Sequence, residues 1–263
     1  MGCDSGDPQG CVRDASEAAK LQGLQSIFLS MFEDPSRTLN DAREYSRLSL
    51  SRPFLSEVGF DDFTARYAKL FSLAGSAPKF DPRTWLRAVV RNVKSANNKL
   101  SFGITLYEDE LDSPYLRSPK LPIDVSRSVD YIHLFLHYRA DAPQYEADVQ
   151  RAKTLFPGAK VIAGLYAYDR VNYIPCATSS ERPCTSGEEL RLYNDAVTIA
   201  ARLLKEGRVA GIEFYPGFFG KEDEWSGWRH RDYCLPERIS ECVENTRTMR
   251  ESTVQILNAT LRW

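Results

Sequence analysis

Apolar and polar positions follow a repeating order along this chain, in which helix-like segments alternate with short strand-like runs. Segments with apolar residues three or four positions apart are separated by runs rich in Ile, Leu, Val and Phe. The pattern predicts strands at residues 24–32, 54–60, 100–107, 129–138, 160–168 and 209–215. It predicts helices at 14–22, 39–48, 63–73, 81–96, 143–155, 187–206 and 236–257.

Strands that alternate with helices favour an α/β fold with parallel strands and right-handed crossovers. Local signals support the helix boundaries, because Asp81 can cap a helix whose first turn suits Pro82, and Gly207 follows another helix. An open nucleotide-binding sheet usually carries a glycine-rich phosphate loop, and neither G-x-G-x-x-G nor G-x-x-x-x-G-K-[ST] occurs. The sequence therefore favours a barrel.

The expected barrel is of the (β/α)8 TIM type, although six strands are recognisable where a complete barrel has eight. We therefore expect a barrel that is incomplete or truncated at its N-terminus. No linker rich in Gly, Ser or Pro divides the 263 residues, so we predict one barrel domain over residues 1–263.

Charge and hydropathy narrow the possible partners. The chain has 34 Lys and Arg against 36 Asp and Glu, a formal net charge of -2, which disfavours a nucleic-acid partner. No apolar run approaches the roughly 20 residues that a membrane-spanning helix needs. We expect no transmembrane segment.

The six cysteines form three pairs, each separated by eight positions: Cys3 and Cys11, Cys176 and Cys184, Cys234 and Cys242. Zinc sites usually carry a C-x-x-C spacing, which is absent, so we predict three local disulfides. Disulfides indicate an oxidising compartment, and we expect a secreted or extracytoplasmic protein, with periplasmic or lipid-anchored variants of that location. Residues 1–13 are then a disulfide-tethered N-terminal segment. Alternatively, Met-Gly-Cys-Asp is a lipoprotein remnant in which Cys3 bears the lipid.

Acidic residues gather where the predicted strands end, which is where barrel enzymes place their active sites. The strand ends are Glu33-Asp34, Asp61-Asp62, Tyr107-Glu108-Asp109, His137-Tyr138-Arg139, Tyr168-Asp169 and Glu213-Phe214-Tyr215. A single acid there can simply cap the next helix, as Asp62 could do before Phe63. Five acidic ends on one rim favour a functional site.

Strand alternation predicts which side chains face the barrel interior. The inward set is Gly59, Asp61, Gly103, Thr105, Tyr107, His133, His137, Gly164, Tyr166, Tyr168, Glu213 and Tyr215. Glu108 has outward parity unless its strand ends at Tyr107.

Paired carboxylates among aromatic residues suit the cleavage of glycosidic bonds, in which one acid protonates the leaving oxygen and the other attacks or activates water. The catalytic candidates are Glu108, Glu213, Asp61 and Asp62. The substrate-binding candidates are Tyr107, His137, Tyr166, Tyr168, Asp169, Tyr215, Trp225 and Trp228. Trp225 and Trp228 belong to an aromatic loop after the last strand, which could stack on sugar rings or plug the barrel mouth.

Several runs resemble secreted TIM-barrel proteins related to glycoside hydrolases, over roughly residues 14–220. They are 58–63 (VGFDDF), 102–107 (FGITLY), 156–157 (FP) followed by 164–169 (GLYAYD), and 206–212 (EGRVAGI). If residues 24–32 form the second barrel strand, the resemblance implies that Glu108 follows the fourth strand and Glu213 lies on the seventh. These positions are similar to those of the acid/base and nucleophile of the large retaining glycosidase clan. Tyr107 stands where that clan usually has Asn.

We therefore predict a glycoside hydrolase-like enzyme that acts on an oligo- or polysaccharide, as a monomer, without a cofactor or metal. One alternative is a non-catalytic barrel that binds carbohydrate or a partner protein. Another is a metal-dependent hydrolase that uses His137 with Asp169, since His133 and His137 share one strand face and could bind a metal with Asp61 or Asp169. Separately, Asn258-Ala259-Thr260 matches the acceptor motif for N-glycosylation in a eukaryotic source.

Overall fold

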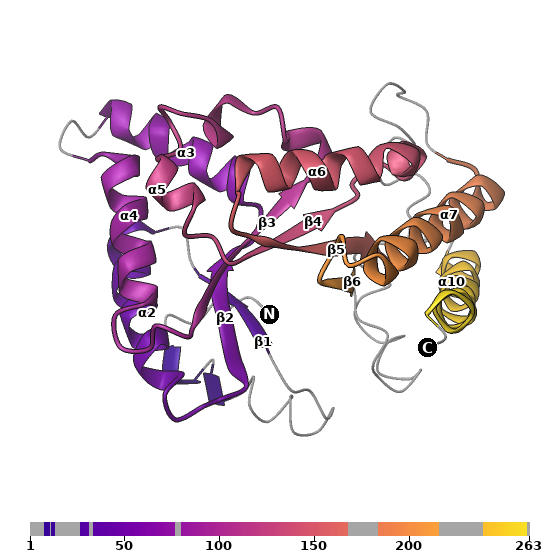
Figure 1. Cartoon of the computed structure of the whole chain (residues 1–263), viewed down its shortest axis with the longest axis horizontal. Helices are drawn as coiled ribbons and strands as arrows, with labels where there is room; N and C mark the ends of the chain where they lie inside the picture. Colours follow the sequence, from indigo (N-terminus) through magenta and orange to yellow (C-terminus); the bar gives the residue numbers. More distant parts are fainter. Residues whose placement is uncertain are drawn as a thin grey trace. The chain divides into compact units, whose positions relative to one another are not determined.

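The computed structural model of the chain describes residues 8–10, 12–13, 27–31, 34–76, 80–167, 184–215 and 239–261 (Figure 1). Its strands are β1 (Ile27–Ser30), β2 (Leu55–Phe60), β3 (Ser101–Tyr107), β4 (Tyr131–Phe135), β5 (Lys160–Tyr166) and β6 (Gly211–Tyr215). Its α-helices are α2 (Pro35–Leu48), α3 (Phe63–Ser76), α4 (Pro82–Val93), α5 (Ile123–Ser126), α6 (Tyr145–Leu155), α7 (Ser186–Lys205) and α10 (Ile239–Thr260). Short 3-10 helices are η1 (Glu108–Glu110), η2 (Pro114–Leu116) and η3 (Arg139–Gln144).

The six strands hydrogen-bond in chain order, β1-β2-β3-β4-β5-β6. Pairing is parallel between β1 and β2, between β2 and β3, and between β5 and β6. Helices intervene between consecutive strands, which confirms the predicted α/β class. Six strands agree with an incomplete barrel, and closure into a barrel stays a prediction. None of the described helices is long and apolar enough to cross a membrane.

The chain divides into two compact units. Unit 1 comprises residues Met1–Leu106, Glu110–His133 and Ala152–Lys160, and unit 2 comprises Tyr107–Asp109, Leu134–Arg151 and Val161–Trp263. The expectation of a single domain stays a prediction.

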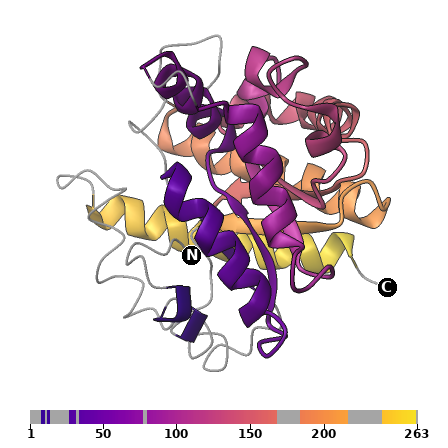
Figure 2. The ribbon, with the colours of Figure 1, turned by 90° about the vertical axis from the view of Figure 1, so that its left-hand side faces the viewer.

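In unit 1, helices α2 and α4 pack side by side (Figures 1 and 2). The Trp85 indole N–H donates to the Pro35 carbonyl at 2.8 Å, and the Asn92 amide donates to the Leu39 carbonyl at 2.8 Å. Helix α4 begins as predicted, because the Asp81 carboxylate accepts hydrogen bonds from the backbone N–H groups of residues 83 and 84. The apolar core of the unit includes Leu29, Val58, Leu86, Val89, Phe102 and Ile104.

Two glycines allow unusually close packing on the face of unit 1 that carries Gly59 and Gly103. The two residues are partners in the β2–β3 register. A Cβ atom added at Gly59 would lie 1.7 Å from the Gly103 carbonyl oxygen, and one added at Gly103 would lie 1.7 Å from Glu57 Oε1. Glycine at these positions therefore makes room for a backbone carbonyl and for a buried carboxylate.

In unit 2, helices α7 and α10 pack against each other, as Figure 1 shows. The hydroxyl groups of Tyr193 and Thr253 form a buried hydrogen bond of 2.6 Å between them. Helix α7 begins with a capping box, in which Thr185 and Glu188 satisfy each other's backbone N–H groups. The core of this unit includes Leu134, Tyr145, Ala163, Leu165, Tyr193 and Val197.

Several predicted boundaries differ from those observed. The helix predicted at 39–48 begins earlier, at Pro35, where the Asp34 carboxylate accepts a hydrogen bond from the Arg37 N–H. The strand predicted at 129–138 ends at Phe135. The Leu136 N–H still donates to the Gly164 carbonyl, and the N–H groups of the next two residues donate to a side chain described below. The strand predicted at 160–168 is described as far as Tyr166, and the helix predicted at 14–22 lies outside the described residues.

Cys184 and Cys242 are both buried and both belong to disulfides. The other four cysteines lie outside the described residues. The three pairings of cysteines eight positions apart, and the extracytoplasmic location inferred from them, stay predictions.

The close approach of Gly59 to Gly103 yields a stability prediction. Because the obstacle is a backbone atom that cannot rotate away, Gly59→Ala should lower the free energy of unfolding by about 3 kcal/mol or more. Gly75→Ala is the matched control, since nothing lies within 4 Å of a Cβ there and helix α3 should gain roughly 0.5–1 kcal/mol. Urea unfolding of both variants measures the difference, and equal midpoints for Gly59→Ala and the unmodified protein would contradict the packing.

Candidate active site

Glu108 stands at the first position after β3, where the chain turns into η1. Strand β3 ends at Tyr107 and Glu108 belongs to η1, so the alternation of the strand no longer directs the Glu108 side chain outward. Its side chain is directed back under the end of β4. Oε2 accepts a hydrogen bond from the His137 N–H at 2.6 Å, and Oε1 accepts one from the Tyr138 N–H at 2.8 Å. Both carboxyl oxygens are therefore held by the backbone.

Burial dominates the ionisation of this acid. Glu108 is only 5% exposed, and loss of hydration raises its pKa to about 8, with the charge of Asp109 adding to the rise. The two backbone N–H donors stabilise the charged form and oppose that rise. The net result is a carboxyl group that is mostly protonated at neutral pH, as a general acid must be.

A buried ion pair holds the segment that follows β4. The Arg139 guanidinium pairs with the Glu189 carboxylate of α7, and both side chains are almost fully buried. The same guanidinium donates to the Tyr166 carbonyl at 2.8 Å and lies over the Tyr193 ring, 4.9 Å from its centroid. Arg139 thus joins the β4 exit, the β5 end and the start of α7.

Aromatic rings gather around these strand ends in unit 2. The Tyr166 hydroxyl donates to the Tyr107 hydroxyl at 3.1 Å, and the Tyr166 ring meets the Tyr215 ring edge-on at 6.0 Å. The His137 ring lies 4.9 Å from the Tyr107 ring, with its Nδ1 3.6 Å from Asp109 Oδ2. Tyr107, Tyr166 and His137 are half-buried and Tyr215 is exposed, so part of each residue is accessible to solvent.

Glu213 lies on β6 beside this aromatic group. The parallel register pairs Glu213 with Gly164 and Tyr215 with Tyr166, so these residues lie side by side on the two strands. Burial raises the pKa of the Tyr145 hydroxyl well above its usual value, and the charges of Glu108 and Glu213 raise it further. Both carboxyl groups therefore lie within electrostatic range of one buried hydroxyl in the same unit.

Asp61 and Asp62 occupy the end of β2 in unit 1. The Asp61 backbone N–H donates to the Ser30 hydroxyl at 3.3 Å, and its carboxylate accepts from the Asp62 N–H at 3.1 Å. Burial raises the pKa of Asp61, and the neighbouring charge of Asp62 raises it further. Asp62 has a φ of 47°, a left-handed conformation that costs a residue with a side chain of order 1–3 kcal/mol.

Glu57 is a buried acid that the sequence interpretation missed. Its Oε1 lies 2.9 Å from Nε2 of His133, and the two side chains are 11% and 9% exposed. Phe28 stacks on the His133 ring at 4.9 Å, and the carboxylate occupies the space that Gly103 leaves open. Strand parity could have found it, because Glu57 shares the alternating positions of Gly59 and Asp61. It was overlooked because it lies inside the strand and not at its end.

Four of the predicted ligand-binding residues, Tyr168, Asp169, Trp225 and Trp228, lie outside the described residues. The metal-dependent hypothesis relied on Asp169, so its geometry lies outside them too. Within the described part of the chain, no group of three or more His, Cys, Asp or Glu side chains could hold a metal ion.

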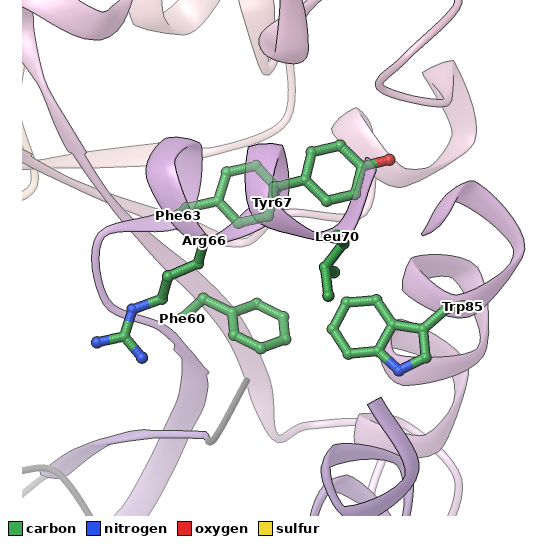
Figure 3. Close-up of a pocket in the computed structure, with 6 residues that line it drawn as sticks. All are labelled: Phe60, Phe63, Arg66, Tyr67, Leu70 and Trp85. Atoms are coloured by element: carbon green, nitrogen blue, oxygen red, sulfur yellow. The ribbon is translucent and has the colours of Figure 1, made fainter. Parts of the chain in front are cut away.

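A separate hollow lies in unit 1 among Phe60, Phe63, Arg66, Tyr67, Leu70 and Trp85 (Figure 3). The Phe60 ring lies 5.7 Å from the Trp85 ring and 6.2 Å from the Phe63 ring. Arg66 directs its guanidinium away from the rings (Figure 3). The space admits about one water molecule, so we interpret it as a gap in aromatic packing and not as a substrate site.

Comparison with known proteins relates this fold to glycoside hydrolases. No protein-family model matches the sequence, and no curated protein matches it significantly. The solved structure of β-glucuronidase 2 from Bacteroides uniformis, covalently bound to cyclophellitol-6-carboxylate aziridine, matches with a TM-score of 0.50 and 11% identity. The match covers 76% of this chain but only 24% of the glucuronidase, so this chain spans about a quarter of that protein.

A second solved structure is an inactive mutant of the GH20 exo-β-N-acetylglucosaminidase from Vibrio harveyi. It matches with a TM-score of 0.40 and 10% identity, over 95% of this chain and 45% of that one. At such low identities a structural likeness shows the fold alone. The chain shares its fold with part of the β-glucuronidase.

The raised pKa of Glu108 predicts a pH dependence of stability. Between pH 4.5 and 8 the folded protein holds the Glu108 proton more tightly than the unfolded chain does. The stabilisation is complete below about pH 4.5 and is lost as pH rises through 8, at about 1.4 kcal/mol per unit of pKa difference. Glu108→Gln removes this titration, so its stability should fall less over that range.

Urea unfolding at several pH values measures both slopes. Glu251→Gln is the control, because it removes an exposed carboxylate on α10 that pairs only with Arg247 at the surface, and it should keep the slope of the unmodified protein. Identical slopes for Glu108→Gln and the unmodified protein would show that Glu108 does not titrate in this range.

Proposed function

We propose that this protein is a glycoside hydrolase that cleaves glycosidic bonds of an oligo- or polysaccharide, with Glu108 and Glu213 as its working carboxyl groups. The proposal assigns Glu108 as the general acid. Glu213 then acts as the nucleophile or as the base that activates water. Asp61 and Asp62, at the end of β2, remain rivals for either role.

The proposal depends on the protonation of Glu108 near neutral pH. Hydrolysis of a glycosidic bond needs one carboxyl group that is protonated near neutral pH and a second that is charged. Burial at the end of β3 supplies the first, since it raises the pKa of Glu108 to about 8. Glu213 is half-buried on β6. Its charge, like that of Glu108, raises the pKa of the Tyr145 hydroxyl.

The proposed reaction is a proton transfer coupled to bond cleavage. Glu108 gives its proton to the leaving glycosidic oxygen as the bond to the anomeric carbon breaks. The Glu213 carboxylate attacks that carbon or takes a proton from the attacking water. Backbone N–H groups of residues 137 and 138 stay in place and stabilise the carboxylate that Glu108 becomes.

The aromatic side chains supply the proposed sugar-binding surface. Tyr107, Tyr166, Tyr215 and His137 present ring faces and polar edges at the ends of β3 to β6, and this combination suits stacking on a sugar and hydrogen bonding to its hydroxyl groups. The Arg139–Glu189 pair keeps the supporting backbone rigid. The chain resembles glycosidases in fold, and its substrate is inferred from these side chains.

A non-catalytic, carbohydrate-binding barrel is the second candidate. The contacts of Glu108 favour it, because both carboxyl oxygens already accept backbone hydrogen bonds and the side chain is only 5% exposed. In that function the acid only fixes the turn after β4, and the aromatic rings bind glycan without cleaving it.

Activity measurements separate the two functions. The purified protein is incubated with a panel of oligo- and polysaccharides, and the products are analysed. On any substrate that is cleaved, Glu108→Gln and Glu213→Gln should each lower the rate by about 10²- to 10⁴-fold, the usual contribution of acid–base groups. Asp61→Asn tests whether Asp61 takes one of these two catalytic roles instead.

Glu251→Gln serves again as the control, since an exposed carboxylate on α10 should not affect the rate. Circular dichroism and unfolding curves verify that each variant is folded. Full activity in both Glu108→Gln and Glu213→Gln would exclude the assignment. Glycan binding without any product would favour the non-catalytic function.

A further inference from the structure

We propose that Asn258, near the end of helix α10, is an N-glycosylation site. It begins the sequence Asn258-Ala259-Thr260, the one place in the chain where Asn precedes Ser or Thr by two positions with a residue other than Pro between them. The motif alone is weak evidence. The surroundings of Asn258 on the helix give independent support.

Helix α10 packs through a single stripe of residues: Cys242, Thr246, Met249 and Thr253 are its buried side chains. Their spacing of three and four positions places all four on one face of the helix. Thr253 contacts α7 directly, because its hydroxyl forms a hydrogen bond with the hydroxyl of Tyr193. A group attached to a side chain on the opposite face of α10 therefore leaves this contact intact.

Asn258 lies on that opposite face. It follows Thr253 by five residues, which rotates it about 140° around the helix axis. It is exposed, as is Val254 one turn earlier, which is 55% exposed. The Asn258 side chain makes no hydrogen bond or ion pair with the described residues, so modification breaks no contact among them.

The two described cysteines point to the compartment in which such a modification occurs. Cys184, which precedes the α7 N-cap, and Cys242, in the buried stripe of α10, are both in disulfides. Disulfides form in the oxidising secretory route, where N-glycosylation also takes place. N-glycosylation of Asn258 and the disulfides of Cys184 and Cys242 can therefore form in the same compartment.

The reaction requires a glycosyl donor, which we identify as a lipid-linked diphosphate oligosaccharide. The side-chain nitrogen of Asn258 forms a bond to the anomeric carbon of the donor. The bond between that carbon and the diphosphate oxygen breaks, the lipid diphosphate leaves, and the amide loses one proton. Thr260 contributes the hydroxyl that the motif requires.

The full chain, placed behind a cleavable secretion signal, is expressed in a eukaryotic cell line that N-glycosylates its secreted proteins. Both secreted and cell-retained protein are collected. The expected result is a heavier species that an amidase specific for N-linked glycans converts to the unmodified size, leaving aspartate at position 258 in the peptide map. Asn258→Gln and Thr260→Ala should abolish the heavier species, and Thr260→Ser should keep it.

The exposed position of Asn258 adds a second expectation. The glycosylated protein should unfold at the same temperature as the deglycosylated protein and as Asn258→Gln, since the glycan projects away from the α7 contact. Protein of unmodified size in both pools, before and after amidase treatment, would overturn the proposal. A heavier species that persists in Asn258→Gln would place the modification elsewhere and overturn it equally.

Discussion

The two hydrogen bonds that Glu108 accepts are the constraint on which the candidate site depends. A strand continues only while its N–H groups find carbonyl partners on a neighbouring strand. The N–H groups of His137 and Tyr138 find the Glu108 carboxyl group instead, so β4 ends and the chain turns into η3. This one side chain therefore determines where the His137 ring stands and where Arg139 enters the core of unit 2. Burial in this position raises the pKa of Glu108 to about 8, although the two N–H donors oppose the rise.

Buried polar groups in both units are accommodated by the residues around them. In unit 1 the Glu57 carboxylate occupies the space over Gly103 and pairs with His133, while in unit 2 Arg139 pairs with Glu189. A buried charge is costly unless it is paired and hydrogen-bonded, and each of these groups has its partner in the same unit. An apolar pair of similar volume could pack at such sites with a smaller loss of hydration free energy. We therefore interpret the polar pairs as groups that hold the strands in a defined arrangement and not as a source of stability.

Fold and function have separate support in this protein. The α/β order and the likeness to a β-glucuronidase concern the fold, and one such fold hosts many chemistries. The proposed function depends on the side chains themselves: an acid that burial keeps protonated, a second carboxylate on β6, and tyrosine rings at the neighbouring strand ends. Much of the fold could be predicted, since alternating helix and strand patterns depend on local spacing that any sequence displays. Less of the site could be predicted, since Glu57 and Glu189 lie inside a strand and a helix, whereas the sequence pattern singles out acids at the strand ends.

The sequence by itself determined the α/β class, the six strands and the Asp81 cap of α4. Each of these follows from periodicity or from interactions within a few residues. Only the tertiary structure decided that Glu108 accepts hydrogen bonds from the β4 exit, that Glu57 meets His133, and that Asn258 faces away from α7. Those results join segments far apart in the chain, and a hydrogen bond across 29 residues is set by how the strands are arranged in space, which no local pattern encodes.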